Sequence, residues 1–183
     1  MARLEVLQYP DPHLKEVSEP ITEITDELRS LACDMCEVMY GEPGIGLAAP
    51  QVGRPVRLVV ADTGWTEEGA ERHPTIMINP ELLEMEGTTK WDEGCLSVPD
   101  FTAEVERSAH VVLRYTNLDG EEIREEADGL RAVCFQHEID HLDGILFIDR
   151  ISRLKRSMYS KKRRKQLRLE QEDDSASLSG GRL

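Results

Sequence analysis

The stretch of sequence that decides the fold is Cys134-Phe135-Gln136-His137-Glu138-Ile139-Asp140-His141-Leu142-Asp143-Gly144. It contains the motif His-Glu-x-x-His on a segment that the sequence predicts to be helical. Residues four apart lie on one face of a helix, so His137 and His141 can present two imidazoles to one metal ion. Glu138 is then placed to handle a proton beside that metal, as in metal-dependent hydrolases.

The residues around the motif favour a buried central helix. Asp128 and Gly129 suit its N-terminus, and Gly144 suits the position after its C-terminus. Apolar residues on more than one face imply that the helix lies inside the protein. They are Leu130, Val133, Cys134, Phe135, Ile139 and Leu142. The alternative, a chance motif on a solvated helix, is weaker, because a buried helix would hide two histidines and a glutamate without purpose.

Two histidines need a third ligand to make a catalytic metal site. In one large class of enzymes this ligand is another histidine six residues on, but Phe147 occupies that position here. A downstream glutamate is also excluded, because residues 150–168 contain none. Cys134 lies about 10.5 Å along the helix axis from His141, too far for both to reach one ion easily. The third ligand is therefore expected upstream.

One upstream candidate lies in the stretch Glu93-Gly94-Cys95-Leu96-Ser97-Val98-Pro99. A cysteine beside a glycine and near a proline is poorly suited to core packing and well suited to an oriented thiolate. The local sequence leaves two alternatives open for Cys95, a metal ligand or a buried thiol. Cys33 and Cys36 form a Cys-x-x-Cys pair inside a predicted helix. We interpret that pair as packing, because redox or zinc motifs of this kind normally lie at a helix start or turn.

A glycine-rich stretch precedes these motifs, with the sequence Gly44-Ile45-Gly46-Leu47-Ala48-Ala49-Pro50-Gln51. It is weak as a phosphate loop, because a third glycine and a following helix start are both missing. Its glycines instead allow the backbone to approach a ligand closely, and Gln51 offers a side-chain amide donor.

Composition narrows the class of protein. The 183 residues, 39% hydrophobic and 32% charged, suffice for one domain with a core. The net charge of -14 argues against nucleic acid binding by the body of the protein. We expect no membrane span and no signal peptide, because the sequence has no apolar run of the required length. The four cysteines are not spaced as a disulfide framework, so a reducing cytoplasm is expected.

The remaining pattern predicts an α+β fold. An amphipathic helix follows Thr25, with the apolar stripe Leu28, Leu31, Ala32, Met35, Val38 and Met39. Strands are predicted at 57–61, 75–78, 105–107 and 111–116, and a hairpin turn at 117–120 leads to another. We therefore expect mixed or antiparallel sheets around the central helix.

The C-terminal part of the chain is strongly basic. Residues 153–168 contain no acid and are predicted to form a helix, with Ile151, Leu154 and Met158 facing inward. Residues 169–183 are rich in Ser, Gly and acids and are predicted to be flexible. A single domain is therefore expected over residues 1–168.

Three of these stretches together, 44–51, 93–97 and 136–141, closely resemble the signature motifs of peptide deformylases, in the same order. Residues 9–12 and 128–130 are also similar to that family, so the resemblance covers roughly residues 1–160. It implies a metal-dependent hydrolase that removes the formyl group from the N-terminal methionine of nascent polypeptides and releases formate. A zinc peptidase and a non-catalytic, metal-stabilised binding module are the alternatives.

The resemblance also implies roles for individual residues. The metal ligands would be Cys95, His137 and His141, with water in an open fourth position. Glu138 would carry the proton, while the Gln51 amide and the Leu96 backbone N–H would hold the oxyanion. The substrate site would comprise Gly44, Ile45, Gly46, Leu47, Glu93, Gly94, Leu130, Val133 and Cys134.

The cofactor and partners follow from the same resemblance. It implies one Fe2+ ion per chain, with Zn2+, Ni2+ or Co2+ as substitutes, because cysteine and histidine suit several of these metals. The expected substrates are N-formylmethionyl nascent peptides in a bacterial cytoplasm. Similarity to bacterial deformylases with an extended C-terminal helix implies that the basic segment docks on the ribosome near the exit tunnel. Neither a membrane nor DNA is expected as a partner.

Overall fold

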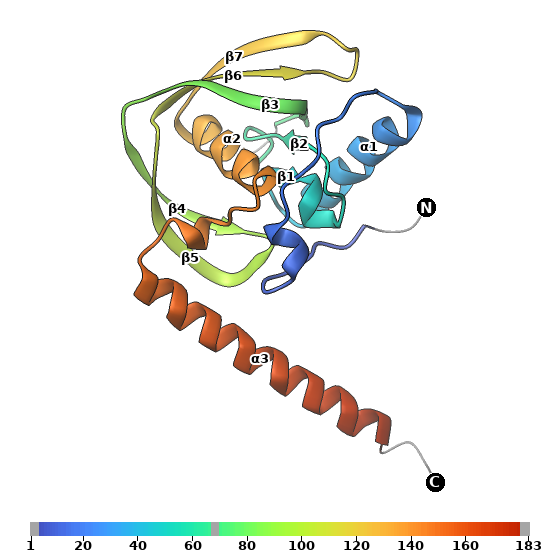
Figure 1. Cartoon of the computed structure of the whole chain (residues 1–183), viewed down its shortest axis with the longest axis vertical. Coiled ribbons are helices and arrows are strands. Elements are labelled where there is room, and N and C mark those ends of the chain that lie inside the picture. The colour runs from blue at the N-terminus through green and yellow to red at the C-terminus, as the bar shows by residue number, and fades with distance from the viewer. Residues whose placement is uncertain (1–3, 67–69, 180–183) are drawn as a thin grey trace.

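The main layer of the structure is a five-stranded antiparallel sheet (Figure 1). The computed structural model describes residues 4–66 and 70–179. In spatial order the strands of this sheet are β1 (Gly46–Ala48), β2 (Leu58–Ala61), β3 (Thr75–Glu86), β6 (His110–Thr116) and β7 (Glu122–Asp128). A separate antiparallel hairpin consists of β4 (Thr89–Cys95) and β5 (Val98–Arg107). Antiparallel sheets combined with helices confirm the predicted α+β class.

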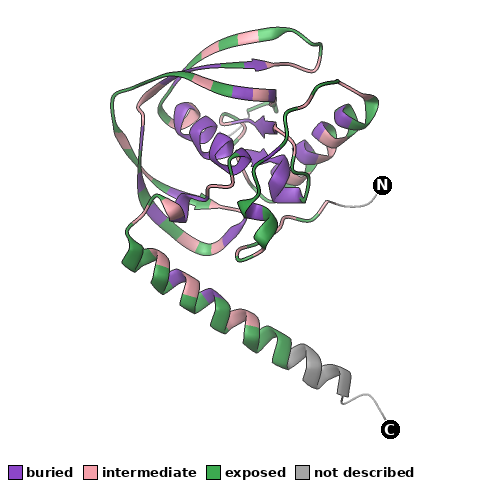
Figure 2. Ribbon diagram, in the orientation of Figure 1, coloured by how far each residue is buried: buried purple, intermediate pink, exposed green. Residues whose placement is uncertain are grey.

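Two helices pack on opposite faces of the five-stranded sheet. The α-helices of the described residues are α1 (Asp26–Gly41), α2 (Gly129–Leu142) and α3 (Arg153–Ser179). Helix α2 packs on the face that carries Val59 and Ala61, whereas α1 packs on the face that carries Leu58 and Val60. Strand β2 is therefore buried on both faces, which explains its unbroken apolar sequence. Figure 2 shows that α2 is buried along most of its length.

The helices begin in different ways. Thr25 caps α1, because its Oγ1 accepts a hydrogen bond from the Leu28 N–H at 3.2 Å. Asp128 precedes α2 as the sequence suggested, but its side chain makes no capping bond. Its Oδ1 lies 2.9 Å from Nδ1 of His110 instead. Because His110 and Asp128 are also paired across β6 and β7, the sheet rather than a cap fixes the start of α2.

Helix α3 projects away from the two sheets toward the C-terminus (Figure 1). The sequence placed the end of this helix at Arg168, whereas in the structure it continues to Ser179. Residues 169–179 contain neither glycine nor proline, so no residue interrupts the helical hydrogen bonds before Gly180. The flexibility expected of residues 169–183 stays a prediction, and residues 180–183 lie outside the described part of the chain.

The face that α3 turns toward the protein differs from the predicted one. Leu154 and Met158 are 72% and 64% exposed, so their assignment to the inward face was wrong. Tyr159 is buried instead, and its ring stacks on that of Phe101 with the ring centroids 4.7 Å apart. Arg163 is also buried, beside the N-terminal segment. An aromatic surface on β5 therefore sets the orientation of α3. Within the described ranges, no helix combines the length and apolar character needed to cross a membrane.

Candidate metal centre

A thiol and two imidazoles meet at the end of β4. Cys95 is the last residue of β4, and His137 and His141 lie one turn apart on α2. The ligating atoms of these three residues all lie within 4.8 Å of one another, and Cys95 Sγ is 3.3 Å from His141 Nε2. Burial, followed by the positive charges of His137 and Arg107, lowers the pKa of His141 well below its ordinary value. A neutral imidazole with its nitrogen toward a thiol is a suitable metal ligand.

Glu93 orients one of the imidazoles. The Nδ1 of His137 donates to Glu93 Oε2 at 2.8 Å, which leaves its Nε2 for a metal. Although burial raises the pKa of Glu93, hydrogen bonds from Arg107 and His137 lower it to about 2. Glu93 is therefore a fixed negative charge behind His137. Glu93 also lines the cavity. Its contact with substrate stays a prediction.

The charge of Glu93 is balanced by a buried network that connects β4, β5 and α2. Arg107 donates to both carboxylate oxygens of Glu93, at 2.6 and 2.9 Å, and to Asp140 Oδ2 at 2.5 Å. Arg150 binds both oxygens of Asp140 from the other side. Sequence reasoning missed this network. Asp140 lies within the motif itself, but nothing in the local sequence identifies Arg107 as its partner.

Glu138 is a buried carboxyl that lines the same cavity. Its Oε2 has no hydrogen-bond partner among the described residues, and a buried polar atom left free in this way is typical of a site that binds a ligand or performs catalysis. Burial is the main reason that the pKa of Glu138 is raised to about 7. A Cβ atom at position 46 would lie 2.5 Å from Glu138 Oε1, so only glycine allows the backbone to approach this carboxyl so closely. The residues present thus fit a metal together with a proton carrier.

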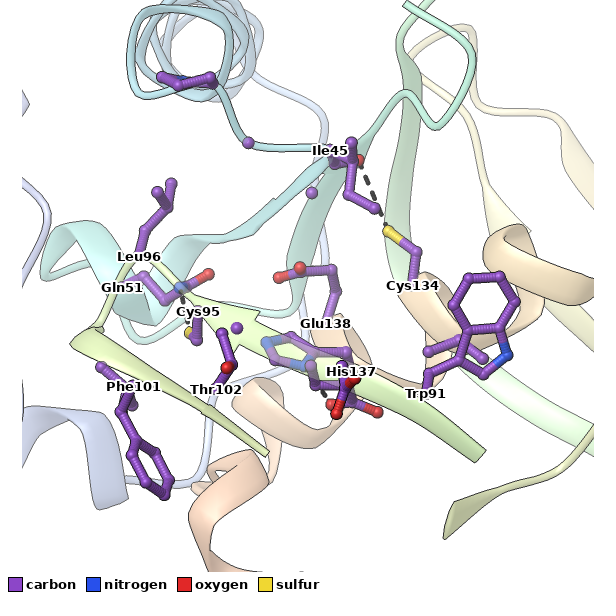
Figure 3. Close-up of a pocket in the computed structure, with 18 of the residues that line it drawn as sticks. Ile45, Gln51, Trp91, Cys95, Leu96, Phe101, Thr102, Cys134, His137 and Glu138 are labelled. Atoms are coloured by element: carbon purple, nitrogen blue, oxygen red, sulfur yellow. Dashed lines mark hydrogen bonds and ion pairs between the residues drawn. The ribbon is translucent and has the colours of Figure 1, made fainter. Parts of the chain in front are cut away.

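Gln51 presents an oriented amide to the same centre. Its Oε1 accepts a hydrogen bond from the Ala48 N–H at 2.8 Å, which fixes the direction of the amide group. The Nε2 donates to Ser97 Oγ at 3.2 Å and points toward Cys95 Sγ at 3.5 Å. Leu96, in the tight turn after β4, lines the cavity next to them. Figure 3 shows the labelled side chains of Gln51, Cys95 and Glu138 in the same pocket.

These groups surround a cavity of about 560 Å³. Most residues expected to bind substrate line it, and they are Gly44, Ile45, Gly46, Glu93, Gly94, Leu130, Val133 and Cys134. Leu47 is the exception, because its fully buried side chain packs in the core beside α1. Trp91 and Phe101 also line the cavity, and the sequence analysis missed both. Trp91 lies two residues before Glu93 on β4, so the two side chains point to the same face of the strand. This period of two could have identified Trp91.

The chain is similar to proteins of one known family. Residues 3–157 match the model of the family described as polypeptide deformylase. A peptide deformylase of Phenylobacterium zucineum (strain HLK1) is 53% identical over 166 residues, which cover 90% of this chain and 97% of the relative.

Solved structures show the same fold. A peptide deformylase from Legionella pneumophila is 37% identical with a TM-score of 0.84, and the match covers 92% of this chain and 98% of that one. A peptide deformylase from Synechococcus elongatus, in complex with actinonin, is 40% identical with a TM-score of 0.81. That match covers 87% of each chain.

Proposed function

The chain belongs to the polypeptide deformylase family, and from this membership we infer that it is a metal-dependent hydrolase. It removes the formyl group from the N-terminal methionine of formylated nascent polypeptides and releases formate. The observation that carries this function is the convergence of three metal-ligating atoms beside the unpaired carboxyl of Glu138. We propose that residues 1–168 act as one catalytic domain.

The proposed cofactor is a divalent transition metal. Cys95, His137 and His141 would hold it, because thiolate and imidazole ligands suit Fe2+ and Zn2+ alike. We propose one Fe2+ ion per chain, with Zn2+, Ni2+ or Co2+ as substitutes. When bound, the metal supplies a Lewis acid at the formyl carbonyl and makes water acidic enough to lose a proton near neutral pH.

The protein's own groups would handle the proton and the developing charge. Glu138, with a pKa of about 7, suits a group that accepts a proton from water and later donates it to the leaving amine. Gln51 Nε2 and the Leu96 backbone N–H would donate hydrogen bonds to the formyl oxygen as it becomes negative. Because the bond from Ala48 already orients Gln51, this donor needs little rearrangement during the reaction.

Selectivity would arise from the shape of the cavity. A formyl group carries hydrogen where an acetyl group carries methyl, so a tight site beside the metal can reject the larger group. The methionine side chain would enter the apolar part of the cavity, which includes Leu130, Val133 and Trp91. Burial raises the pKa of Cys134 well above its ordinary value, so this thiol stays neutral and serves as a wall.

The peptide backbone would bind as an added strand. Strand β1 is an edge of the five-stranded sheet, and among the strands of residues 4–66 and 70–179 β4 pairs only with β5. Gly46 of β1 and Gly94 of β4 both line the cavity. Main-chain hydrogen bonds to such edges would allow many sequences to follow the methionine.

The proposed function is tested by assaying formate release from formyl-Met-Ala-Ser by the metal-loaded protein. Acetyl-Met-Ala-Ser should be left intact in parallel, because the acyl group is too large. Cleavage of a peptide bond inside a doubly blocked peptide, without formate release, would instead identify a peptidase.

The role of Gln51 can be tested by its substitution with leucine. Gln51→Leu keeps most of the volume and removes the donor, so we expect kcat to fall by about 10²- to 10³-fold. Gln136→Leu is the matched control, because Gln136 is also a buried amide but bonds to the Ser108 backbone outside the cavity. An effect of Gln51→Leu confined to KM would mean that this residue only binds substrate.

We further propose that α3 docks the enzyme on the ribosome in a bacterial cytoplasm, where formylated chains emerge. The support is the surface of this helix, which exposes cations that ribosomal RNA phosphates could contact. They are Lys161, Lys162, Arg164, Lys165 and Arg168. Arg163 has a different role, since it donates to the Tyr9 carbonyl at 3.2 Å and to Gln8 at 2.8 Å.

This docking predicts a salt-dependent interaction. The double variant Lys161→Glu/Lys165→Glu should bind ribosomes more weakly, with the slope of log K against log salt reduced by about 2. Co-sedimentation with ribosomes at several salt concentrations measures this slope. Arg29→Glu/Arg54→Glu, on another part of the surface, changes the net charge equally and should bind as the parent does. Equal sedimentation of all three proteins would contradict the docking.

A further inference from the structure

Residues 43–46 form one wall of the cavity and are held partly from outside the main sheet. Gly46 is the first residue of β1 that pairs with β2, so residues 43–45 lie beyond the end of the strand pairing. A Cβ atom at position 46 would lie 2.5 Å from Glu138 Oε1, so the Gly46 backbone runs close to this carboxyl. The position of residues 43–45 therefore depends on contacts outside the strand pairing, whereas β2 holds Gly46 beside Glu138.

Trp65 makes a hydrogen bond to this wall from the loop after β2. Its Nε1–H donates to the Gly44 carbonyl oxygen at 2.8 Å. Backbone bonds hold the flanking groups, with the Gly44 N–H donating to Met39 and the Ile45 carbonyl accepting from Asp62, each at 2.9 Å. Trp65 itself does not line the cavity. It therefore supports the wall from behind.

Trp65 is held in turn by aromatic and charged neighbours. Its ring packs edge-to-face on Tyr40, with centroids 5.2 Å apart and an interplanar angle of 83°. The guanidinium of Arg72 lies 4.3 Å from the centroid of the Tyr40 ring and 5.6 Å from that of Trp65. The Tyr40 hydroxyl donates to Asp62 at 2.7 Å. We call Tyr40, Asp62, Trp65 and Arg72 the indole clamp.

The bond to Gly44 has a geometric consequence for its neighbour. The Gly44 carbonyl and the Ile45 N–H belong to one planar trans peptide unit, so they point in opposite directions. By fixing the carbonyl toward the indole, Trp65 also fixes the direction of the Ile45 N–H. No acceptor for this N–H is found in the part of the chain that the structure describes. It is therefore a fixed donor on a residue that lines the cavity.

We propose that Trp65 is a positioning residue, which orients the Ile45 N–H so that it can bind a carbonyl group of the substrate backbone. This inference rests on the proposed function, because it concerns the peptide strand that would lie along residues 43–46. Loss of the indole bond would leave the chemical groups in place while weakening peptide binding. The effect should therefore appear in KM more than in kcat.

The test is steady-state kinetics of metal-loaded Trp65→Phe with formyl-Met-Ala-Ser. This variant keeps an aromatic ring but lacks the N–H, and we expect KM to rise by about 3- to 10-fold, as for the loss of one hydrogen bond. Metal content should stay at the parent level and kcat should change by less than about twofold. Tyr115→Phe is the control, because it removes one side-chain hydrogen bond, to Glu125, on strands away from the clamp.

A second variant covers the case in which Trp65→Phe fails to fold. Arg72 is exposed, so Arg72→Gln should fold normally and raise KM by about twofold, the size expected for one exposed cation–π contact. Parent KM in both variants, or a loss confined to kcat, would overturn the positioning role. A parent protein that releases no formate would instead overturn the proposed function itself.

Discussion

Replacing Glu138 with glutamine is expected to leave the protein loaded with metal while lowering turnover by about 10²- to 10⁴-fold. The variant has nearly the same volume, so it should leave the close contact with Gly46 intact. It cannot accept and return a proton, and general acid–base catalysis typically contributes a factor of this size. The measurements are metal content per chain and the rate of formate release from formyl-Met-Ala-Ser.

Glu125→Gln is the matched control for this experiment. Glu125 is a partly buried carboxylate, whereas Glu138 is buried, and Glu125 lies on β7, where it pairs with Arg131 and Tyr115. The control should keep the parent rate. If Glu138→Gln lost its metal together with its activity, Glu138 would have to be a ligand, and its assignment as proton carrier would be wrong.

Replacing Cys95 with alanine should abolish tight metal binding. Two imidazoles alone leave the site short of one ligand and of its negative charge. Even partners that only orient a metal ligand typically contribute 10- to 100-fold in affinity, so the loss here should exceed about 100-fold. Metal content after extensive dialysis, together with a competition titration against a chelator, measures it.

Cys33→Ser is the appropriate comparison for Cys95→Ala. Cys33 is exposed on α1, so serine should leave both metal content and activity unchanged. Cys36 is a poorer choice, because it is buried and a hydroxyl there would be placed in the apolar core beside α1. Retention of metal by Cys95→Ala and its loss from Cys33→Ser would show that the proposed ligand set is wrong.

Elements with a regular apolar spacing could be predicted from the sequence. The predicted strands overlap β2, β3, β5, β6 and β7. Strand β4 was missed, because its inward-facing positions are Trp91, Glu93 and Cys95, and a carboxylate in the middle breaks the expected apolar alternation. That carboxylate is tolerated inside the protein because Arg107 and His137 bind it, and the pairing of β4 with β5 is needed to bring Arg107 to it.

Some residues of the candidate site could likewise be predicted from the sequence, and others could not. The two histidines could be paired from the sequence, because a helix brings residues four apart onto one face. The role of Cys95 could not be decided locally, since its approach to His141 depends on how the β4–β5 hairpin packs against α2. The outward exposure of Leu154 and Met158 likewise depended on the surface that α3 meets, and no feature of the helix itself indicates it.

The unpaired edges of β1 and β4 also bear on the solubility of the protein. An open strand edge can pair with the edge of another molecule, and this pairing is a common route to aggregation. Both edges border the cavity, whose volume is about 560 Å³. A single extended segment can enter such a space, whereas the sheet of a folded neighbour is too broad to do so. The protein can therefore keep two strand edges available without offering them for self-association.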